Sequence, residues 1–265
     1  MYSSVKLGIK FIRYWFSAEN GKGHGVHSPF VFDFISKVLN DEGEYYCYNS
    51  IEQLREDLLK NTTLLELEDF GAGSRMHASY KRRINEIALS SLKPRKFARL
   101  LFRMVNYYQP DSVLELGTSL GITTAYLASA DEQKPVTTME GAKAVAALAG
   151  NNFKRLGLKN VSIIEGNFDY RLPQFIKTAA KVDFVYVDGN HRKEPTLKYF
   201  ELLLEKIHDN SIIVFDDVHW SSEMEAAWDL IKAHSRVTLS IDLFFVGIVF
   251  FRPEQKIKQD FVIRF

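Results

Sequence analysis

From Pro110 onward, short apolar runs alternate with amphipathic stretches, and this rhythm constrains the fold more than any other feature of the sequence. The runs are Ser112–Leu116, Val136–Glu140, Val161–Glu165, Val182–Val187, Ser211–Phe215, Val237–Leu243 and Phe245–Phe251. Helix-like stretches separate the first six of them: Ile122–Ala130, Ala142–Leu156, Tyr170–Ala179, Pro195–Ile207 and Met224–Ala233. Strands that alternate with helices are typical of an α/β sheet with helices on both faces.

The direction of the strands follows from their composition and connections. Phe184–Val187 and Ile212–Phe215 are almost continuously apolar, as in parallel strands that helices cover on both sides. The last two runs are joined through Asp242–Phe244, which leaves no room for a crossover helix. We therefore predict a doubly wound, seven-stranded α/β sheet with a terminal antiparallel hairpin.

The first part of the chain lacks this rhythm and is rich in helix signals and turn residues. Pro94 precedes a helix-like segment, Arg95–Tyr108, that leads into the first strand. We therefore predict a mainly helical extension over residues 1–94, which covers the site, and a sheet domain over residues 95–265. With 265 residues, 46% of them hydrophobic, the chain has enough apolar surface to bury a core.

Charge and cysteine content narrow the function classes. Lys and Arg number 34 and Asp and Glu 33, so the net charge of +1 gives no electrostatic case for nucleic acid. The single cysteine, Cys47, excludes an intramolecular disulfide and a four-cysteine zinc site. No apolar run approaches the ~20 residues of a membrane-spanning helix. We expect a cytoplasmic protein that acts on a small molecule, without stable membrane insertion, and a homodimer stays open.

The first residues form a separate amphipathic pattern. Leu7, Phe11, Tyr14 and Trp15 lie at helical spacing, with Lys10 and Arg13 between them. These charges interrupt the apolar region that a secretory signal needs. The pattern favours an amphipathic helix docked on the domain, and a helix on a membrane surface is the alternative.

A glycine loop follows the first strand of the predicted sheet. The strand ends at Leu116, Gly117 permits a tight turn, and a helix begins near Ser119, so backbone N–H groups can approach a ligand. The spacing Gly-x-x-x-Gly differs from the Gly-x-Gly-x-x-Gly of a dinucleotide site. Glu140, 23 positions after Gly117, is placed to accept hydrogen bonds from two ribose hydroxyls. The set favours a nucleoside ligand.

These motifs resemble those of the class I S-adenosylmethionine-dependent methyltransferases, whose fold is Rossmann-like. The loop is similar to their first motif in its small-molecule O-methyltransferase variant, with Ser119 in place of the middle glycine. Glu140-Gly141 resembles their ribose-binding acid and its neighbour, and Gly166-Asn167-Phe168 their loop beside the adenine. The resemblance covers roughly residues 95–252. It implies S-adenosylmethionine as cofactor, bound by Glu115, Gly117, Thr118, Ser119, Gly121, Glu140, Gly141, Gly166, Asn167, Phe168 and Asp188.

A second glycine loop, Asp69–Ser74, has a similar local pattern and follows the strand-like run Leu64–Leu67. The stretch after it, Arg75–Leu92, is polar and helix-like, and no strand ending in an acid stands at the proper distance. We therefore interpret this loop as a turn or a cover over the site.

Three carboxylates fall at strand ends. Asp188 ends the fourth run, and Asp216 and Asp217 follow the fifth. If these strands are neighbours, the acids meet at one rim, where like charges repel and raise one another's pKa. Mg²⁺ or Ca²⁺ removes that repulsion and takes oxygen-only ligands. Capping of the helices that follow is the alternative role.

The same three acids resemble the metal ligands of cation-dependent O-methyltransferases. Asp217 places the chain closer to the sugar and macrolide members than to the catechol members, which usually carry Asn there. Those relatives often have an acidic base two positions after the first ligand, where this chain has Asn190. Asn190 cannot take a proton, so another group has to act as the base.

Two histidines are candidates for that base. His191 and His219 lie three positions or fewer after a candidate ligand, and imidazole titrates near neutral pH. We therefore predict His191, His219 and Asp188 as catalytic residues. A hydrogen-bonded histidine at the rim is the alternative for each ring.

The combined hypothesis is O-methylation of a small-molecule hydroxyl with S-adenosylmethionine and a divalent cation, Mg²⁺ in first place. A metal-independent methyltransferase and a nucleoside-binding protein without catalysis are the alternatives. An amino-group methyltransferase usually carries an Asn/Asp-Pro-Pro-aromatic run after the fourth strand, whereas this chain has Asp188-Gly189-Asn190-His191. The glycine spacing disfavours a nicotinamide oxidoreductase.

Overall fold

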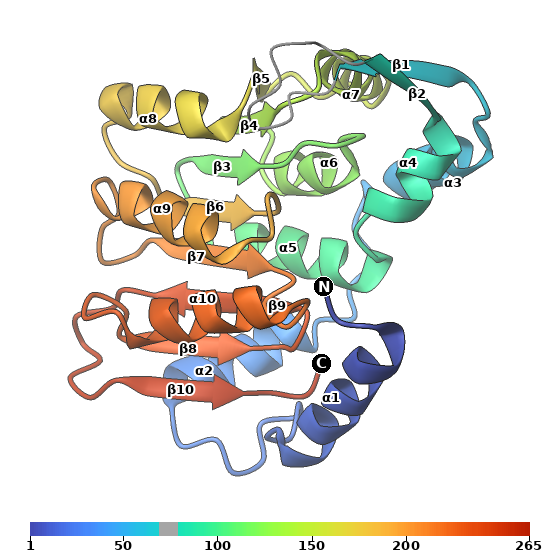
Figure 1. The fold of residues 1–265 in the computed structure, drawn as a ribbon. Helices are drawn as coiled ribbons and strands as arrows, with labels where there is room; N and C mark the ends of the chain where they lie inside the picture. Colours follow the sequence, from blue (N-terminus) through green and yellow to red (C-terminus); the bar gives the residue numbers. More distant parts are fainter. Residues whose placement is uncertain (69–78) are drawn as a thin grey trace. The chain divides into compact units, whose positions relative to one another are not determined.

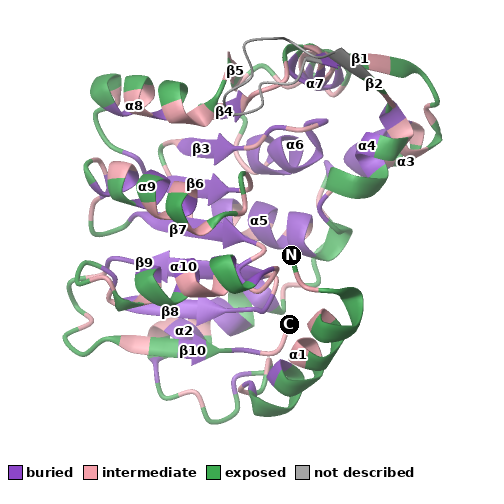
Figure 2. Ribbon diagram, viewed as in Figure 1, coloured by how far each residue is buried: buried purple, intermediate pink, exposed green. Residues whose placement is uncertain are grey.

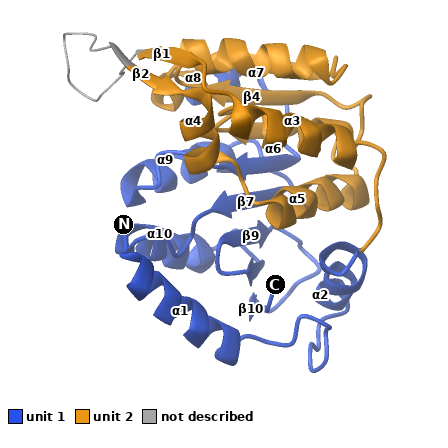
Figure 3. Ribbon diagram, turned by 90° about the vertical axis from the view of Figure 1, so that its right-hand side faces the viewer, with its two compact units in different colours: residues 1–41, 172–265 blue, residues 42–171 orange. Residues whose placement is uncertain are grey.

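The computed structural model describes residues 1–68 and 79–265. The chain divides into two compact units, residues 1–41 with 172–265 (unit 1) and residues 42–171 (unit 2), which Figure 3 colours separately. The predicted extension over residues 1–94 is therefore shared between the two units. The predicted glycine loop Asp69–Ser74 lies outside the described residues.

Unit 2 begins with helices and a hairpin. Its first elements are α3 (Tyr48–Lys60), β1 (Leu64–Glu68), β2 (Ser79–Arg83), α4 (Ile84–Ser91) and α5 (Arg95–Tyr108). β1 and β2 pair antiparallel, with Leu64 opposite Arg83. The helix-like interpretation of Arg75–Leu92 is therefore wrong for Ser79–Arg83, because β1 supplies a pairing partner and the helix begins only at Ile84.

Three parallel strands form the sheet of unit 2, in the order β3-β4-β5 (Figure 1). They are β3 (Val113–Leu116), β4 (Val136–Glu140) and β5 (Val161–Glu165). The crossover helices are α6 (Ile122–Ser129), after β3, and α7 (Lys143–Arg155), after β4. Since the strands are parallel, their carboxyl ends and the loops that follow lie at one edge.

Unit 1 contains five strands in the order β10-β8-β9-β7-β6. They are β6 (Phe184–Val187), β7 (Ile212–Asp216), β8 (Leu239–Asp242), β9 (Val246–Phe250) and β10 (Gln259–Val262). β6 and β7 are parallel, and β9 runs antiparallel to both β7 and β8. The predicted hairpin is therefore confirmed as β8–β9, and β10 adds an eighth strand, parallel to β8.

The helices of unit 1 cover these strands on two faces. They are α1 (Ser4–Ser17), α2 (Pro29–Phe34) with a π-helical turn η1 (Ile35–Leu39), the end of α8 (Phe168–Thr178), α9 (Lys193–Leu204) and α10 (Ser222–Ala233). In Figure 1, α9 and α10 lie in front of the strands of unit 1 and α2 lies behind them.

Burial explains why the strand runs could be recognised in the sequence. Every residue of β3, β6, β7, β8 and β9 is buried, which Figure 2 shows as purple strands. A strand that is covered on both faces has no polar face, so its sequence is continuously apolar. The seven predicted runs correspond to β3–β9, and the predicted α/β class with mostly parallel strands is confirmed.

Candidate active site

The glycine loop of unit 2 lies at the carboxyl ends of β3 and β4. The N–H groups of Gly117 and Thr118 donate to the carbonyl oxygen of Met139, at 3.0 and 3.1 Å. Gly117, Ser119 and Gly121 have φ angles of 111°, 47° and 82°. Residues with a Cβ rarely adopt positive φ, so the turn requires glycine at its two ends and strains Ser119.

Glu115 lies beneath this loop. Its side chain is fully buried, and its Oε2 accepts hydrogen bonds from the hydroxyls of Thr124 and Thr138, the latter at 2.6 Å. The hydroxyls of Thr118 and Thr138 lie 2.6 Å apart and connect the loop to the same cluster. Glu115 and Thr118, both predicted to bind the cofactor, therefore have their side chains in the interior, where they shape the loop.

Glu140, at the end of β4, is held by backbone donors. Its Oε2 accepts from the N–H of Ser119 and its Oε1 from the N–H of Ala142, both at 2.9 Å. A Cβ built on the neighbouring Gly141 would meet no atom within 4 Å in the described part of the chain. Each carboxylate oxygen has a second lone pair, so a carboxylate fixed in this way can accept two hydrogen bonds from adjacent hydroxyls of a ligand.

The loop after β5 reaches the same edge of the sheet. The N–H of Gly166 donates to the carbonyl oxygen of Glu140 at 2.8 Å, and Gly166 has a φ of 124°. Asn167 accepts the N–H of Asp169 on its Oδ1 at 2.8 Å, and Phe168 begins α8. The structure thus brings together the carboxyl ends of β3, β4 and β5 and the segments that follow them, where all the predicted cofactor residues of unit 2 lie.

The three predicted metal ligands stand at strand ends in unit 1. Asp216 is the last residue of β7, Asp217 follows it, and Asp188 follows β6. Val187 of β6 pairs with Phe215 of β7, so Asp188 and Asp216 occupy equivalent positions in the register. The condition for the acids to meet, that their strands are neighbours, is therefore fulfilled.

His191 pairs with Asp188. Its Nε2 lies 3.4 Å from Oδ1 of Asp188, whose Oδ2 accepts a hydrogen bond from the hydroxyl of Tyr186 at 3.2 Å. Burial by itself lowers the pKa of His191, but the bond to Asp188 and the charges of Asp188, Asp217 and Asp216 raise that pKa above its usual value. Among the described residues, only the Nε2 of this ring is paired, so Nδ1 can take a proton from a ligand.

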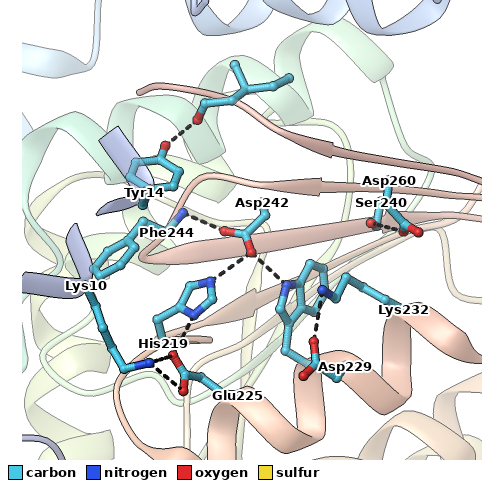
Figure 4. Close-up of polar contacts among 12 residues, drawn as sticks. Lys10, Tyr14, His219, Glu225, Asp229, Lys232, Ser240, Asp242, Phe244 and Asp260 are labelled. Carbon is cyan, nitrogen blue, oxygen red and sulfur yellow. Dashed lines mark hydrogen bonds and ion pairs between the residues drawn. The ribbon is translucent and has the colours of Figure 1, made fainter. Parts of the chain in front are cut away.

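His219 is held by carboxylates on both sides (Figure 4). Its Nδ1 lies 3.0 Å from Oε1 of Glu225, its Nε2 lies 2.8 Å from Oδ2 of Asp242, and the ring stacks on Phe244. Burial lowers the pKa of His219, but the bonds to Asp242 and Glu225 raise it overall. With both ring nitrogens engaged, the imidazole has no atom left for the proton of a substrate. This geometry favours the alternative of a hydrogen-bonded structural histidine, and the role of His219 as a base stays a prediction.

The described residues contain no preformed cluster of ligands for the predicted cation. Within residues 1–68 and 79–265, no three His, Cys, Asp or Glu side chains are arranged to hold one ion. Asp188 is directed to His191 instead. The oxygen donors of the three carboxylates suit Mg²⁺, and the cation stays a prediction.

Sequence reasoning missed two residues that support the glycine loop. Thr138 bonds to Glu115, its partner in the β3–β4 register, and the hydroxyl of Ser91 in α4 lies 2.7 Å from that of Ser119. The register itself was the signal for Thr138, because directly paired residues of parallel strands carry their side chains on the same face. No local signal marks Ser91, which comes from a different helix.

Residues 114–218 match a family model described as a methyltransferase domain. An O-methyltransferase from Bacillus cereus in complex with SAH has a similar structure, with a TM-score of 0.57, 19% identity and coverage of 80% of this chain and 93% of that chain. The SAH-bound Podospora anserina methyltransferase PaMTH1 has a TM-score of 0.58 and 16% identity, and the match covers 85% of this chain and 97% of that chain. TomG from Streptomyces achromogenes, an O-methyltransferase of tomaymycin synthesis in complex with SAM, has a TM-score of 0.55 and 18% identity. That match covers 84% of this chain and 95% of that chain. A search of the curated proteins finds no match.

Residues 114–218 thus resemble a methyltransferase domain, and this segment is called the methyltransferase domain below. The matched segment starts in β3 and ends just after the paired acids, so it contains the glycine loop, Glu140 and all three candidate ligands. The resemblance to the class I S-adenosylmethionine-dependent methyltransferases is thereby confirmed. The three similar structures, at 16–19% identity, share the fold of this methyltransferase domain and its flanking segments.

Gly121→Ala should destabilise the methyltransferase domain by about 1–3 kcal/mol. The new methyl group would have to adopt a φ of 82° and would lie 2.6 Å from Cε1 of Phe153. Gly141→Ala is the matched control, since its methyl group would have no atom of the described residues within 4 Å. Urea unfolding measures both variants, and equal stability of Gly121→Ala and the wild type would contradict this loop geometry.

Proposed function

We propose that the methyltransferase domain transfers the methyl group of S-adenosylmethionine to a hydroxyl oxygen of a small molecule. The observation that carries the proposal is the carboxylate of Glu140, fixed by two backbone N–H groups beside the glycine loop. Nucleosides bind at the carboxyl ends of parallel strands, where such an acid accepts hydrogen bonds from both ribose hydroxyls. The similar fold of the Bacillus cereus O-methyltransferase supports oxygen as the acceptor atom.

The cofactor would use all three loops of unit 2. We assign the ribose to Glu140 and the methionine portion to the loop from Gly117 to Gly121, whose glycines let backbone come close to a ligand. The adenine would lie beside Gly141 and the segment from Gly166 to Phe168. The open space above Gly141 supports this placement, because a side chain at this position would occupy room that a flat base needs.

Methyl transfer to a hydroxyl also requires a proton acceptor. The new carbon–oxygen bond forms as the sulfur–carbon bond breaks, S-adenosylhomocysteine leaves, and the proton of the hydroxyl passes to a base. We assign this proton to Nδ1 of His191, because Nε2 faces Asp188, which orients the ring. Positioning of the acceptor in line with the sulfonium supplies much of the rate.

We further propose that a divalent cation assists the transfer. When bound, Mg²⁺ lowers the pKa of an acceptor hydroxyl, and Asp188, Asp216 and Asp217 are the oxygen donors that it would use. Turnover in EDTA decides this point. Loss of turnover that Mg²⁺ restores supports the cation, whereas unchanged turnover supports the metal-independent alternative, in which Asp188 orients His191 without a cation.

Calorimetric titration with S-adenosylmethionine tests the cofactor site. The wild type should bind, and Glu140→Gln should weaken binding about 10- to 100-fold, because one charged hydrogen bond contributes about 1.5–3 kcal/mol. Glu165→Gln is the matched control, since Glu165 pairs with Glu140 in the β4–β5 register and is exposed. No binding by the wild type, or equal weakening by both variants, would overturn the assignment.

The acceptor atom is tested separately by transfer of a labelled methyl group. The substrate panel should hold phenols, sugars and amines of similar size. We expect label on hydroxyl compounds only. Label on amines alone would retain methyl transfer and overturn the assignment to oxygen.

A further inference from the structure

Helix α1 carries two apolar stripes. The inner one, which includes Phe11 and Tyr14, packs against Phe244 and Phe245 of unit 1, so the predicted docking of this helix is confirmed. The outer stripe repeats at i, i+4, i+7 and i+11, the spacing of one helix face. It consists of Val5, Ile9, Ile12 and Phe16, whose exposed fractions are 75%, 49%, 56% and 81%.

The outer stripe is a continuous surface. Trp15, 43% exposed, lies next to it, and Phe11, Ile12, Trp15 and Phe16 line a shallow hollow without polar atoms. Figure 2 shows the helix as largely exposed, and in Figure 3 it runs along the outer edge of unit 1. Exposed apolar side chains that gather on one face mark an interaction site, whereas scattered ones do not.

The charge of this surface is of one sign. Residues 1–18 contain Lys6, Lys10 and Arg13 and no Asp or Glu. Lys10 is neutralised by Glu225 at 2.8 Å, while Lys6 and Arg13 are exposed and flank the apolar stripe on one side. The surface therefore combines exposed apolar side chains and a tryptophan with cations.

The helix presents this surface without having to detach from unit 1. Its first turns are fixed by Glu225, which accepts from Lys10 and from the hydroxyl of Tyr2 at 2.7 Å. Its last turn is fixed by the hydroxyl of Tyr14, which donates to the carbonyl oxygen of Ile263. A ligand for the outer stripe thus meets a preformed helix and pays no ordering cost.

We propose that α1 docks the protein on the surface of an anionic phospholipid bilayer. The outer stripe would enter the boundary between headgroups and acyl chains, and Lys6 and Arg13 would contact the phosphate groups, as in interfacial helices. The helix would lie flat, because its 14 residues span only about 21 Å. Among the described residues, no helix is long and apolar enough to cross a bilayer.

Charge argues for a lipid surface over a second copy of the chain. A two-fold dimer through this face would bring Lys6 and Arg13 of both copies into one interface. Residues 1–18 offer no carboxylate to pair with them. An anionic bilayer supplies both the apolar layer and the opposite charge.

Vesicle flotation with the full chain tests the proposal. The probes are vesicles of phosphatidylcholine alone and vesicles with 30 mol% phosphatidylglycerol. We expect at least about tenfold stronger binding to the anionic vesicles, and a steep loss of binding at high salt, because two exposed cations face the phosphates. A shift in tryptophan fluorescence that disappears in Trp15→Phe, while flotation persists, would place α1 in the interface.

Matched variants distinguish vesicle binding through α1 from nonspecific binding by other exposed apolar side chains. Ile12→Glu should lower binding to anionic vesicles about tenfold or more, since it puts a carboxylate into the apolar stripe. Leu89→Glu is the control: Leu89 is 75% exposed on α4, so the variant makes the same change of charge and removes at least as exposed an apolar side chain, away from α1. It should bind as the wild type does. Circular dichroism confirms that both variants are folded.

Three results would overturn the proposal. They are absence of vesicle binding, equal binding to neutral and anionic vesicles, and equal loss in Ile12→Glu and Leu89→Glu. A dimer in sedimentation that Ile12→Glu dissociates would assign the stripe to a second copy instead.

Discussion

Asp188→Asn is expected to lower turnover by about 100-fold or more, the scale of general-base catalysis. The amide has no charge to pair with Nε2 of His191, which lies 3.4 Å from the carboxylate, so the ring loses its orientation. Asn190 cannot take over the role. The effect should appear in kcat, with the dissociation constant of S-adenosylmethionine changed less than kcat.

A second Asp–His pair, at the opposite end of β6, provides the control. Asp183 directly precedes β6 and lies 2.8 Å from Nε2 of His208, whereas Asp188 directly follows β6. Asp183→Asn therefore removes an equivalent pair from the amino end of the strand. It should lower stability and leave kcat of the folded protein within about twofold, since residues at that end of a parallel strand lie away from the ligand edge.

The double variant with His191→Asn distinguishes two roles of Asp188. If Asp188 acts through His191, the double variant is no slower than the slower single variant, because residues that act as one unit are not additive. If Asp188 holds a cation, the two losses multiply and Mg²⁺ titration changes with Asp188→Asn alone. Wild-type kcat in Asp188→Asn would contradict both roles.

Asp242→Asn is expected to lower the free energy of unfolding by about 3–5 kcal/mol, the cost of breaking a buried ion pair. Asp242 is 4% exposed, and its Oδ2 accepts from Nε2 of His219 at 2.8 Å and from Nε1 of Trp228 at 3.0 Å. Its Oδ1 accepts the N–H of Phe244 at 2.8 Å. The variant leaves the His219 imidazolium with one of its two carboxylates.

Asp229→Asn is the matched control and lies in the same region (Figure 4). Asp229 is 73% exposed and lies 3.0 Å from Lys232, so the loss should stay below about 1 kcal/mol. Urea unfolding measures both variants. Equal losses would show that the buried carboxylate contributes no more than a surface ion pair.

The stability difference between Asp242→Asn and the wild type should depend on pH. Burial raises the pKa of Asp242, but the bond to His219 lowers it below its usual value, so its contribution is lost as pH falls through that lowered pKa. The pKa of His219 is raised, so its contribution is present below about pH 6.5 and lost as pH rises through the raised pKa. Unfolding at about pH 5.5 should therefore show a larger difference than unfolding at about pH 9. A difference that grows with pH would contradict this ion pair.

The parts of the fold that the sequence predicted are those with a local signal. The runs of β3 and β6–β9 are mostly apolar because both faces of these strands are buried, and β4 and β5 are rich in β-branched residues. Both patterns are visible in any short window. β10 and β2 have no such signal. In β10, only Phe261 is buried, and β2, Ser79–Arg83, is polar apart from Tyr80. Both strands therefore exist because a neighbouring strand offers backbone partners.

The candidate site divides in the same way. The glycine loop and Glu140 were recognised from residue types at fixed spacing, because positive φ angles and strand ends are properties of a few consecutive residues. The partners of His219 were not recognisable, since Glu225 and Asp242 stand 6 and 23 positions away. Both histidines carry the same local signal, and only their surroundings distinguish them.

The sequence by itself determined the α/β class, the position of the methyltransferase motifs and the order of the acids along the chain, because periodicity and turn chemistry act over a few residues. Only the tertiary structure decided that His191 keeps one ring nitrogen available among the described residues, while His219 is enclosed by two carboxylates. It also decided that α1 keeps an exposed apolar stripe after docking. Burial and hydrogen bonding depend on segments far apart in the chain, and folding alone brings those segments together.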